Sequence, residues 1–128
     1  MLRIVLLVNG IVDLLAAAIL ILFPAVGWRI PGYDLIGPEA AFAAGGWAIA
    51  TLALGVSRIW AAYTPVFRRF AGAVALVEGT LLGTFCLLRL ATGANPLSQV
   101  ALVLPVGTIF PAVYAVGLVL DRRSRPQD

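Results

Sequence analysis

Four long apolar segments follow one another along the 128-residue sequence, separated by short stretches rich in proline, glycine and polar residues. The apolar segments lie at about residues 2–23, 39–63, 66–91 and 97–120. A helix needs roughly 20 apolar residues to cross the hydrocarbon core of a bilayer, and each segment reaches that length. The pattern predicts a single all-α domain, an integral-membrane four-helix bundle with a short polar tail at 121–128.

The stretches between these segments have the composition of turns. The first, residues 25–38, contains three glycines and two prolines, and the second is the single break Thr64–Pro65. The third contains glycine, asparagine and proline within residues 93–96. Such clusters of turn-forming residues interrupt helices. We therefore expect antiparallel neighbours joined by one long and two short connections.

Two prolines fall inside the fourth segment, at Pro105 and Pro111. Proline is tolerated in a membrane-spanning helix because neighbouring groups satisfy the carbonyls that lose their hydrogen bonds. We expect the fourth helix to be kinked at both positions.

The composition excludes a water-soluble fold. Hydrophobic residues make up 62% of the chain and charged residues only 12%, whereas soluble domains are about one-quarter charged. A polar surface that covers the whole molecule cannot be built from so few charged residues. The integral-membrane prediction is therefore strengthened.

The distribution of arginine predicts how the helices are oriented. All nine basic residues are arginine. With four spans, seven of them fall on the side of the two termini: Arg3, Arg58, Arg68, Arg69, Arg122, Arg123 and Arg125. The opposite side has only Arg29 and Arg89. Because positive charge stays inside, both termini are expected in the cytoplasm of a bacterial cell, with the chain in its cytoplasmic membrane. The arginines form no contiguous soluble face, so no nucleic-acid partner is expected.

Small residues recur at intervals of four and indicate helix-packing surfaces. The third segment has one such ridge, and the second segment has two. Their members are Ala75, Gly79 and Gly83, then Ala41 and Gly45, and then Gly46 and Ala50. These ridges predict close packing within the bundle; the alternative is a contact between copies in a homo-oligomer.

Two acidic residues lie at matched depth inside the predicted spans. Asp13 is ten residues from Arg3, and Glu78 is ten residues from Arg68. At a rise of about 1.5 Å per residue, both lie roughly 15 Å below the membrane surface, near the centre of the bilayer. An acidic residue there costs on the order of 2.5–3.5 kcal/mol. We therefore expect both to face the bundle interior.

Other polar residues belong to the same level of the bundle. Asn9 lies one turn from Asp13 on the same helix face, and Arg58 and Tyr114 reach similar or shallower depth from neighbouring segments. One hypothesis is a proton, cation or amphipathic-ligand site formed by Asn9, Asp13, Arg58, Glu78 and Tyr114. The alternative is that the two acids are structural and hold the helices together.

The sequence contains no recognisable catalytic or metal-binding arrangement. There is no histidine, and the only cysteine, Cys86, lies in an apolar segment where it is interpreted as a packing residue. No Ser-His or Cys-His pair and no glycine-rich phosphate loop is present. We expect no enzymatic activity, no metal and no cofactor.

Several motifs resemble those of the DoxX-like and BphX-like group of small bacterial four-span proteins. They are Leu2–Arg3–Ile4, Asn9–Gly10 with Asp13, Leu22–Phe23–Pro24, Gly45–Gly46–Trp47, Leu54–Gly55 with Arg58, and Arg68–Arg69 with Glu78. The resemblance covers most of the chain. It implies a four-helix membrane fold and no particular activity, because these families mostly lack an established one.

A second resemblance is to the small multidrug resistance transporters. They are similar in length and number of spans, and have one acidic residue in the middle of the first span, where Asp13 stands. This chain departs from them in having aspartate there, a second acid at Glu78, a long first connection, and no matching aromatic signature in the later spans.

Two functional hypotheses follow. The first is an accessory or scaffold subunit of a larger membrane complex, because the chain is small, lacks catalytic groups and has several packing ridges. The second is a proton- or cation-coupled transporter, or a ligand-binding bundle, that uses Asp13 and Glu78.

Overall fold

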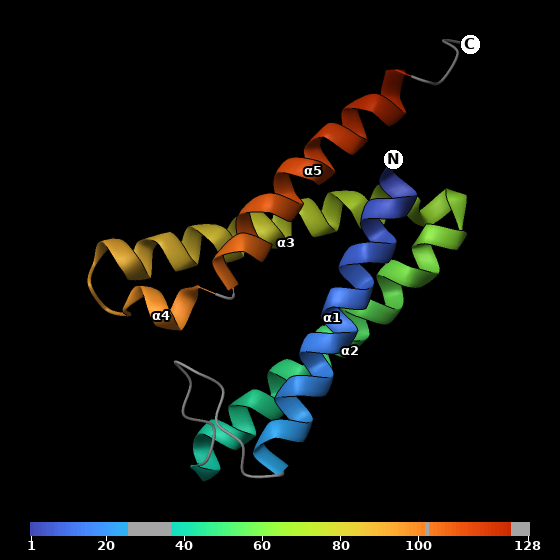
Figure 1. The fold of residues 1–128 in the computed structure, drawn as a ribbon. Helices are drawn as coiled ribbons and strands as arrows, with labels where there is room; N and C mark the ends of the chain where they lie inside the picture. The colour runs from blue at the N-terminus through green and yellow to red at the C-terminus, as the bar shows by residue number, and fades with distance from the viewer. Residues whose placement is uncertain (26–36, 102, 124–128) are drawn as a thin grey trace.

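The structure, a computed structural model, describes residues 1–25, 37–101 and 103–123. This part of the chain is entirely helical apart from short connections (Figure 1). The helices are α1 (Leu2–Ala25), α2 (Pro38–Tyr63), α3 (Pro65–Ala91), α4 (Leu97–Val100) and α5 (Val103–Arg123). Four of them, α1, α2, α3 and α5, are long and apolar enough to cross a membrane. The predicted all-α class with four potential spans is confirmed.

Proline determines where two of the long helices begin. α2 begins at Pro38 and α3 at Pro65, each one residue earlier than predicted. Proline suits the first helical position because its φ is already helical and its missing N–H would have no partner there. The connection from α2 to α3 is a single residue, Thr64, whose N–H donates to the carbonyl of Ala61 over 3.2 Å. α2 and α3 are therefore joined by a sharp corner.

The first and fourth predicted spans have different bounds in the structure. Within the predicted span 97–120 the structure describes two helices, α4 and α5, and Pro105 in the first turn of α5 has no N–H to donate to the carbonyl of Ala101. α5 then continues to Arg123, beyond the predicted end. α1 likewise extends past Pro24 to Ala25.

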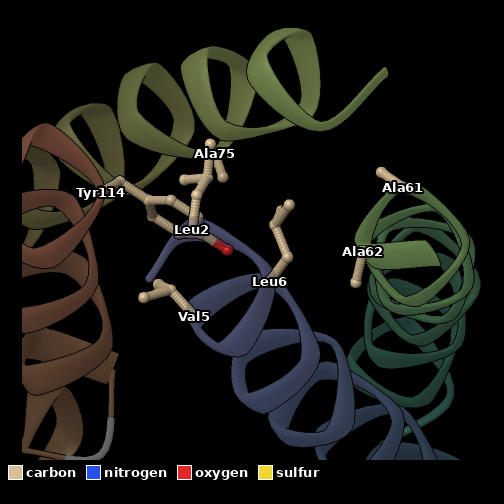
Figure 2. Close-up of a cluster of buried hydrophobic side chains, with 7 residues drawn as sticks. All are labelled: Leu2, Val5, Leu6, Ala61, Ala62, Ala75 and Tyr114. Atoms are coloured by element: carbon tan, nitrogen blue, oxygen red, sulfur yellow. The ribbon is translucent and has the colours of Figure 1, made fainter. Parts of the chain in front are cut away.

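The long helices are arranged as two pairs. α1 packs along α2, and α3 packs along α5 (Figure 1). The two pairs meet in one apolar core, formed by Leu2, Val5, Leu6, Ala61, Ala62, Ala75 and Tyr114 (Figure 2). These residues come from the start of α1, the end of α2, the first half of α3 and the second half of α5. The pairs are thus joined near the α2–α3 corner.

Each pair is held by a contact between two glycines. A Cβ atom placed on Gly10 of α1 would lie 2.9 Å from the carbonyl oxygen of Gly55 of α2. A Cβ atom placed on Gly83 of α3 would lie 2.2 Å from the carbonyl oxygen of Gly107 of α5. Both distances are shorter than the van der Waals contact distance between a carbon and an oxygen atom. Only glycine allows the two helix backbones to approach this closely.

The ridge predicted on α3 lies against α5 and the core. Besides Gly83, it includes Ala75, which is 2% exposed, and Gly79, where a Cβ atom would lie 2.5 Å from Cγ of Pro111. Within the described residues, this ridge packs inside the molecule.

The two ridges predicted on α2 are not covered by the described part of the chain. Ala50 and Gly46 are exposed, Ala41 and Gly45 are half-buried, and no described atom lies within 4 Å of a Cβ atom placed on either glycine. The small residues that α2 does bury are Ala44, Ala48, Gly55, Ala61 and Ala62. Spacing alone did not distinguish these faces, because all of them carry small residues four apart.

Charged residues gather at the corner end of the bundle. Arg68 donates to the carbonyl of Ala62 over 2.9 Å, and Arg69 Nε lies 2.8 Å from Asp121 Oδ2. The guanidinium of Arg3 lies over the ring of Tyr63, 5.1 Å from its centre. These contacts bring the start of α1, the α2–α3 corner and the end of α5 to one end of the molecule.

Candidate functional site

A buried arginine connects two carboxylates from different helices. Arg58 of α2 donates through Nη1 to Oδ2 of Asp13 of α1, and through Nη2 to Oε2 of Glu78 of α3. Arg58 is 5% exposed and Asp13 is 7% exposed. The structure therefore brings together the two acids that depth counting paired, with Arg58 between them.

Asp13 is fully engaged by its neighbours. Its second oxygen, Oδ1, accepts a hydrogen bond from Nδ2 of Asn9 over 3.2 Å. Asn9 precedes Asp13 by four residues, which places the two side chains on one face of α1. Asn9 is itself buried, at 3% exposed. Both carboxylate oxygens of Asp13 thus have a partner, as a buried charge requires.

Glu78 is engaged through only one oxygen. Its side chain is 38% exposed, against 9% for the side chain of Asp13. Only Oε2 accepts a hydrogen bond from the described part of the chain; Oε1 has no partner there. The two acids are therefore not equivalent: one is enclosed, and the other has a free, accessible oxygen.

The glycine contact between α1 and α2 positions the ion pair. Gly10 precedes Asp13 by three residues, and Gly55 precedes Arg58 by three. A Cβ atom on Gly55 would lie 3.1 Å from Cβ of Asp13, which shows how closely the helices approach here. Three residues are about one helical turn. The crossing therefore places Asp13 and Arg58 next to the point of closest approach.

Tyr114, also predicted at this level, lies in the apolar core. It is completely buried, and Figure 2 shows it reaching from α5 toward Leu2 and Ala75. Its hydroxyl has no hydrogen-bond partner among the described residues. Tyr114 therefore makes no hydrogen bond to the ion pairs within the described residues, but it lies close enough to Arg58, Asp13 and Glu78 to interact with their charges.

The charged cluster forms the polar end of a cavity of about 440 Å³. The cavity lies between the two helix pairs and is lined by α1, α2, α3 and α5. Its polar lining consists of Asn9, Asp13, Thr51, Arg58 and Glu78. Most of the other lining residues are apolar, among them Leu15, Ile19, Leu20, Trp47, Leu54, Leu82, Val103, Val106 and Phe110. The volume lies within the usual range for small-molecule sites, about 300–1,000 Å³.

The cavity extends away from the corner end of the bundle. Asn9 and Arg58 line it on the corner side, whereas Leu20 and Trp47 line it farther along the same two helices. The apolar core with Leu6 and Tyr114 lies on the corner side of the charged cluster. The charges are therefore at the inner end of the cavity, with the core behind them.

Some lining residues were not predicted. Trp47, Thr51 and Phe110 are not among the predicted site residues. A signal existed on α2, because Trp47, Thr51, Leu54 and Arg58 follow intervals of four, three and four residues. Such intervals keep side chains on one helix face. The lining residues of α5, Val103, Val106 and Phe110, likewise lie three and four residues apart.

The charge balance determines what this site can bind. Arginine remains protonated in proteins, so the ionised cluster has two negative charges against one positive charge. A proton or a cation neutralises the remaining negative charge. Among the described residues, no group of three His, Cys, Asp or Glu side chains is placed to hold a metal ion.

Comparisons with protein-family models, with curated proteins and with solved structures found no match to this chain.

Proposed function

We propose that this chain is an integral membrane protein that binds an amphipathic small molecule in the cavity between its two helix pairs. Binding serves either transport or ligand sensing. One observation supports the proposal most directly: the ion-paired cluster of Asp13, Arg58 and Glu78 lies at the inner end of a cavity of about 440 Å³ with apolar walls.

A purely structural role explains this arrangement less well. Holding α1 to α2 requires only the enclosed pair of Asp13 and Arg58. Glu78 adds a further negative charge that is partly exposed to the cavity and has one free oxygen among the described residues. A charge in an apolar membrane environment is costly. An interaction between Glu78 and a ligand would explain why this charge is present in an apolar environment.

The proposal includes a location and an orientation. We place the chain in a bacterial cytoplasmic membrane with both termini in the cytoplasm, and we propose that it is related to the DoxX-like and BphX-like group of small bacterial four-span proteins. Support comes from the arginines at the corner end, where Arg3, Arg68 and Arg69 make contacts at the start of α1 and at the α2–α3 corner. The cavity then lies in the half of the membrane farther from the cytoplasm. We further propose that α5 bends at Pro105 and Pro111.

An accessory or scaffold subunit is a second candidate. The observation that favours it is the accessible α2 face around Gly45 and Gly46, where no described side chain packs. A partner helix, from a second copy or another subunit, would be able to approach closely there.

The two candidates are separated by closing the cavity. Ala50 lines the cavity and Ala53, three residues later, is exposed outside it. We would purify the wild type, Ala50→Trp and Ala53→Trp from the same membranes and compare bound small molecules by mass spectrometry. The binding proposal expects an amphipathic small molecule to be bound to the wild type and to Ala53→Trp, and to be missing from Ala50→Trp. If all three proteins fold and carry the same bound small molecules, the binding proposal is wrong.

A further inference from the structure

We infer that the ligand of this cavity is a lipophilic monocation, an apolar body with one positive charge that pairs with Oε1 of Glu78. The inference rests on the proposed function and specifies the chemical class that the cavity accepts.

The charge of the cluster indicates a cation. Asp13 and Glu78 together have one more charge than Arg58 neutralises. Both terminal nitrogens of Arg58 already donate to carboxylates. An anionic ligand would need to displace one of these bonds and would add negative charge to a site that already has an excess. A monovalent cation brings the cluster to neutrality, which a low-dielectric site favours.

The geometry indicates which acid meets the ligand. Asp13 has both oxygens occupied, by Asn9 and Arg58, and its side chain is only 9% exposed. Glu78 lines the cavity and keeps Oε1 without a partner among the described residues, while Oε2 remains bonded to Arg58. A ligand cation is thus able to pair with Oε1 without breaking an existing ion pair.

The lining of the cavity indicates that the rest of the ligand, around its positive charge, is apolar. Beyond the cluster the lining is almost entirely aliphatic and aromatic, with Trp47 from α2 and Phe110 from α5. Aromatic faces attract cations, and tryptophan does so most strongly. A strongly hydrated ion such as an alkali metal would lose its water to a lining with few oxygen ligands, because outside the ion pairs the described lining offers only Oε1 of Glu78, Asn9 and Thr51. A delocalised or alkylated cation pays a smaller dehydration cost.

The test compares three probes of similar shape and different charge. They are tetraphenylphosphonium, neutral triphenylphosphine oxide and tetraphenylborate. Binding to the protein in lipid nanodiscs would be measured by equilibrium dialysis, with the value for protein-free nanodiscs subtracted. The proteins are the wild type, Glu78→Gln, Glu78→Asp, Ala50→Trp and, as a matched control, Glu39→Gln, which changes an exposed acid outside the cavity lining.

We expect wild type and Glu39→Gln to bind one phosphonium per chain. Glu78→Gln should weaken that binding by at least about tenfold, the loss of roughly one favourable charge interaction. Glu78→Asp keeps the charge and should lose less. The neutral probe should bind wild type and Glu78→Gln alike, and the borate should not bind above the blank. If Glu78→Gln fails to fold, the three probes on the wild type still decide the charge preference.

One result overturns the inference but leaves the proposed function standing. In that result the neutral or anionic probe binds the wild type more tightly than the cation does, and Ala50→Trp abolishes that binding. The inference is also overturned if a folded Glu78→Gln keeps the affinity of the wild type for the cation. If no probe of any charge shows binding that Ala50→Trp removes, the proposed function fails together with the inference.

Discussion

At the scale of single residues, the cluster depends on Arg58. Its guanidinium has two parallel pairs of donors, and this shape allows it to bind two carboxylates from different helices at once. Lysine has one compact ammonium group and lacks that geometry. Arg58 is buried, so its charge is compensated by these carboxylates and not by water.

Replacing Arg58 by methionine should strongly destabilise the protein. The substitution leaves Asp13 and Glu78 near each other without a cation, and removing one partner of a buried pair costs about 3–5 kcal/mol. The free energy of unfolding would be measured in mixed micelles with increasing denaturing detergent. Arg89→Met is the control, because Arg89 is exposed and bonds Asn95 at the other end of α3; it should change stability little.

Combining Arg58→Met with Asp13→Asn and Glu78→Gln should restore most of that loss. The triple variant contains no charge in the cluster, so no charge is left uncompensated. If the triple variant remains as unstable as Arg58→Met alone, the loss comes from packing and the electrostatic explanation is wrong.

The hydroxyl of Tyr114 should contribute nothing favourable to stability. It is buried without a hydrogen-bond partner among the described residues, and burying an unpaired polar group costs about 1–3 kcal/mol. Tyr114→Phe should therefore keep or raise the free energy of unfolding, by about 1 kcal/mol. Tyr114→Ala should lose about 3–5 kcal/mol, because it removes a ring from the core. A loss above about 1 kcal/mol in Tyr114→Phe would show that the hydroxyl is hydrogen-bonded.

At the scale of helices, close packing within each pair depends on glycine. In Gly83→Ala the new methyl group would meet the backbone of Gly107, which cannot turn aside as a side chain does. We expect a loss of about 1–3 kcal/mol, the usual cost of overpacking, in the same unfolding assay. Gly45→Ala is the matched control on open α2 surface. It should gain up to about 1 kcal/mol, because alanine is the better helix former. Equal effects of the two substitutions would contradict the packing described for α3 and α5.

The sequence predicted the helices better than it predicted their faces. Apolar length defined the four spans, and Pro38 and Pro65 marked the starts of α2 and α3 to within one residue. The division between α4 and α5 was missed because apolar residues continue across it. The packing face of α2 was missed because small residues four apart occur on several of its faces. Which face is buried is decided by the partner helix, which spacing does not reveal.

Only part of the candidate site was predictable from the sequence, because spacing along a helix does not reveal how the helices pack against one another. Depth counting from Arg3 and Arg68 paired Asp13 with Glu78, since depth depends only on helical rise. The bridge through Arg58, the different exposure of the two acids and the cavity all depend on how the helix pairs are placed relative to each other. None of these features is encoded in the spacing along one helix.

At the scale of the whole molecule, the proposed orientation places the α2–α3 corner and the α3–α4 connection on opposite sides of the membrane. Single cysteines would be introduced in a Cys86→Ala background, at Thr64 in the corner and at Thr92 after α3. In bacterial spheroplasts, an impermeant maleimide should label Thr92→Cys. It should label Thr64→Cys only after lysis. The reverse pattern would contradict the proposed orientation, and labelling of both before lysis would contradict the four-span arrangement.

The central claim is that Glu78 belongs to a binding site and is not a structural brace. The most direct measurement determines phosphonium affinity and the free energy of unfolding on the same preparation of Glu78→Gln. We expect at least about tenfold weaker binding, with stability within about 1 kcal/mol of the wild type, because Asp13 and Arg58 still form a complete pair. Unchanged binding together with a loss of about 3 kcal/mol or more would contradict it and identify Glu78 as a structural residue.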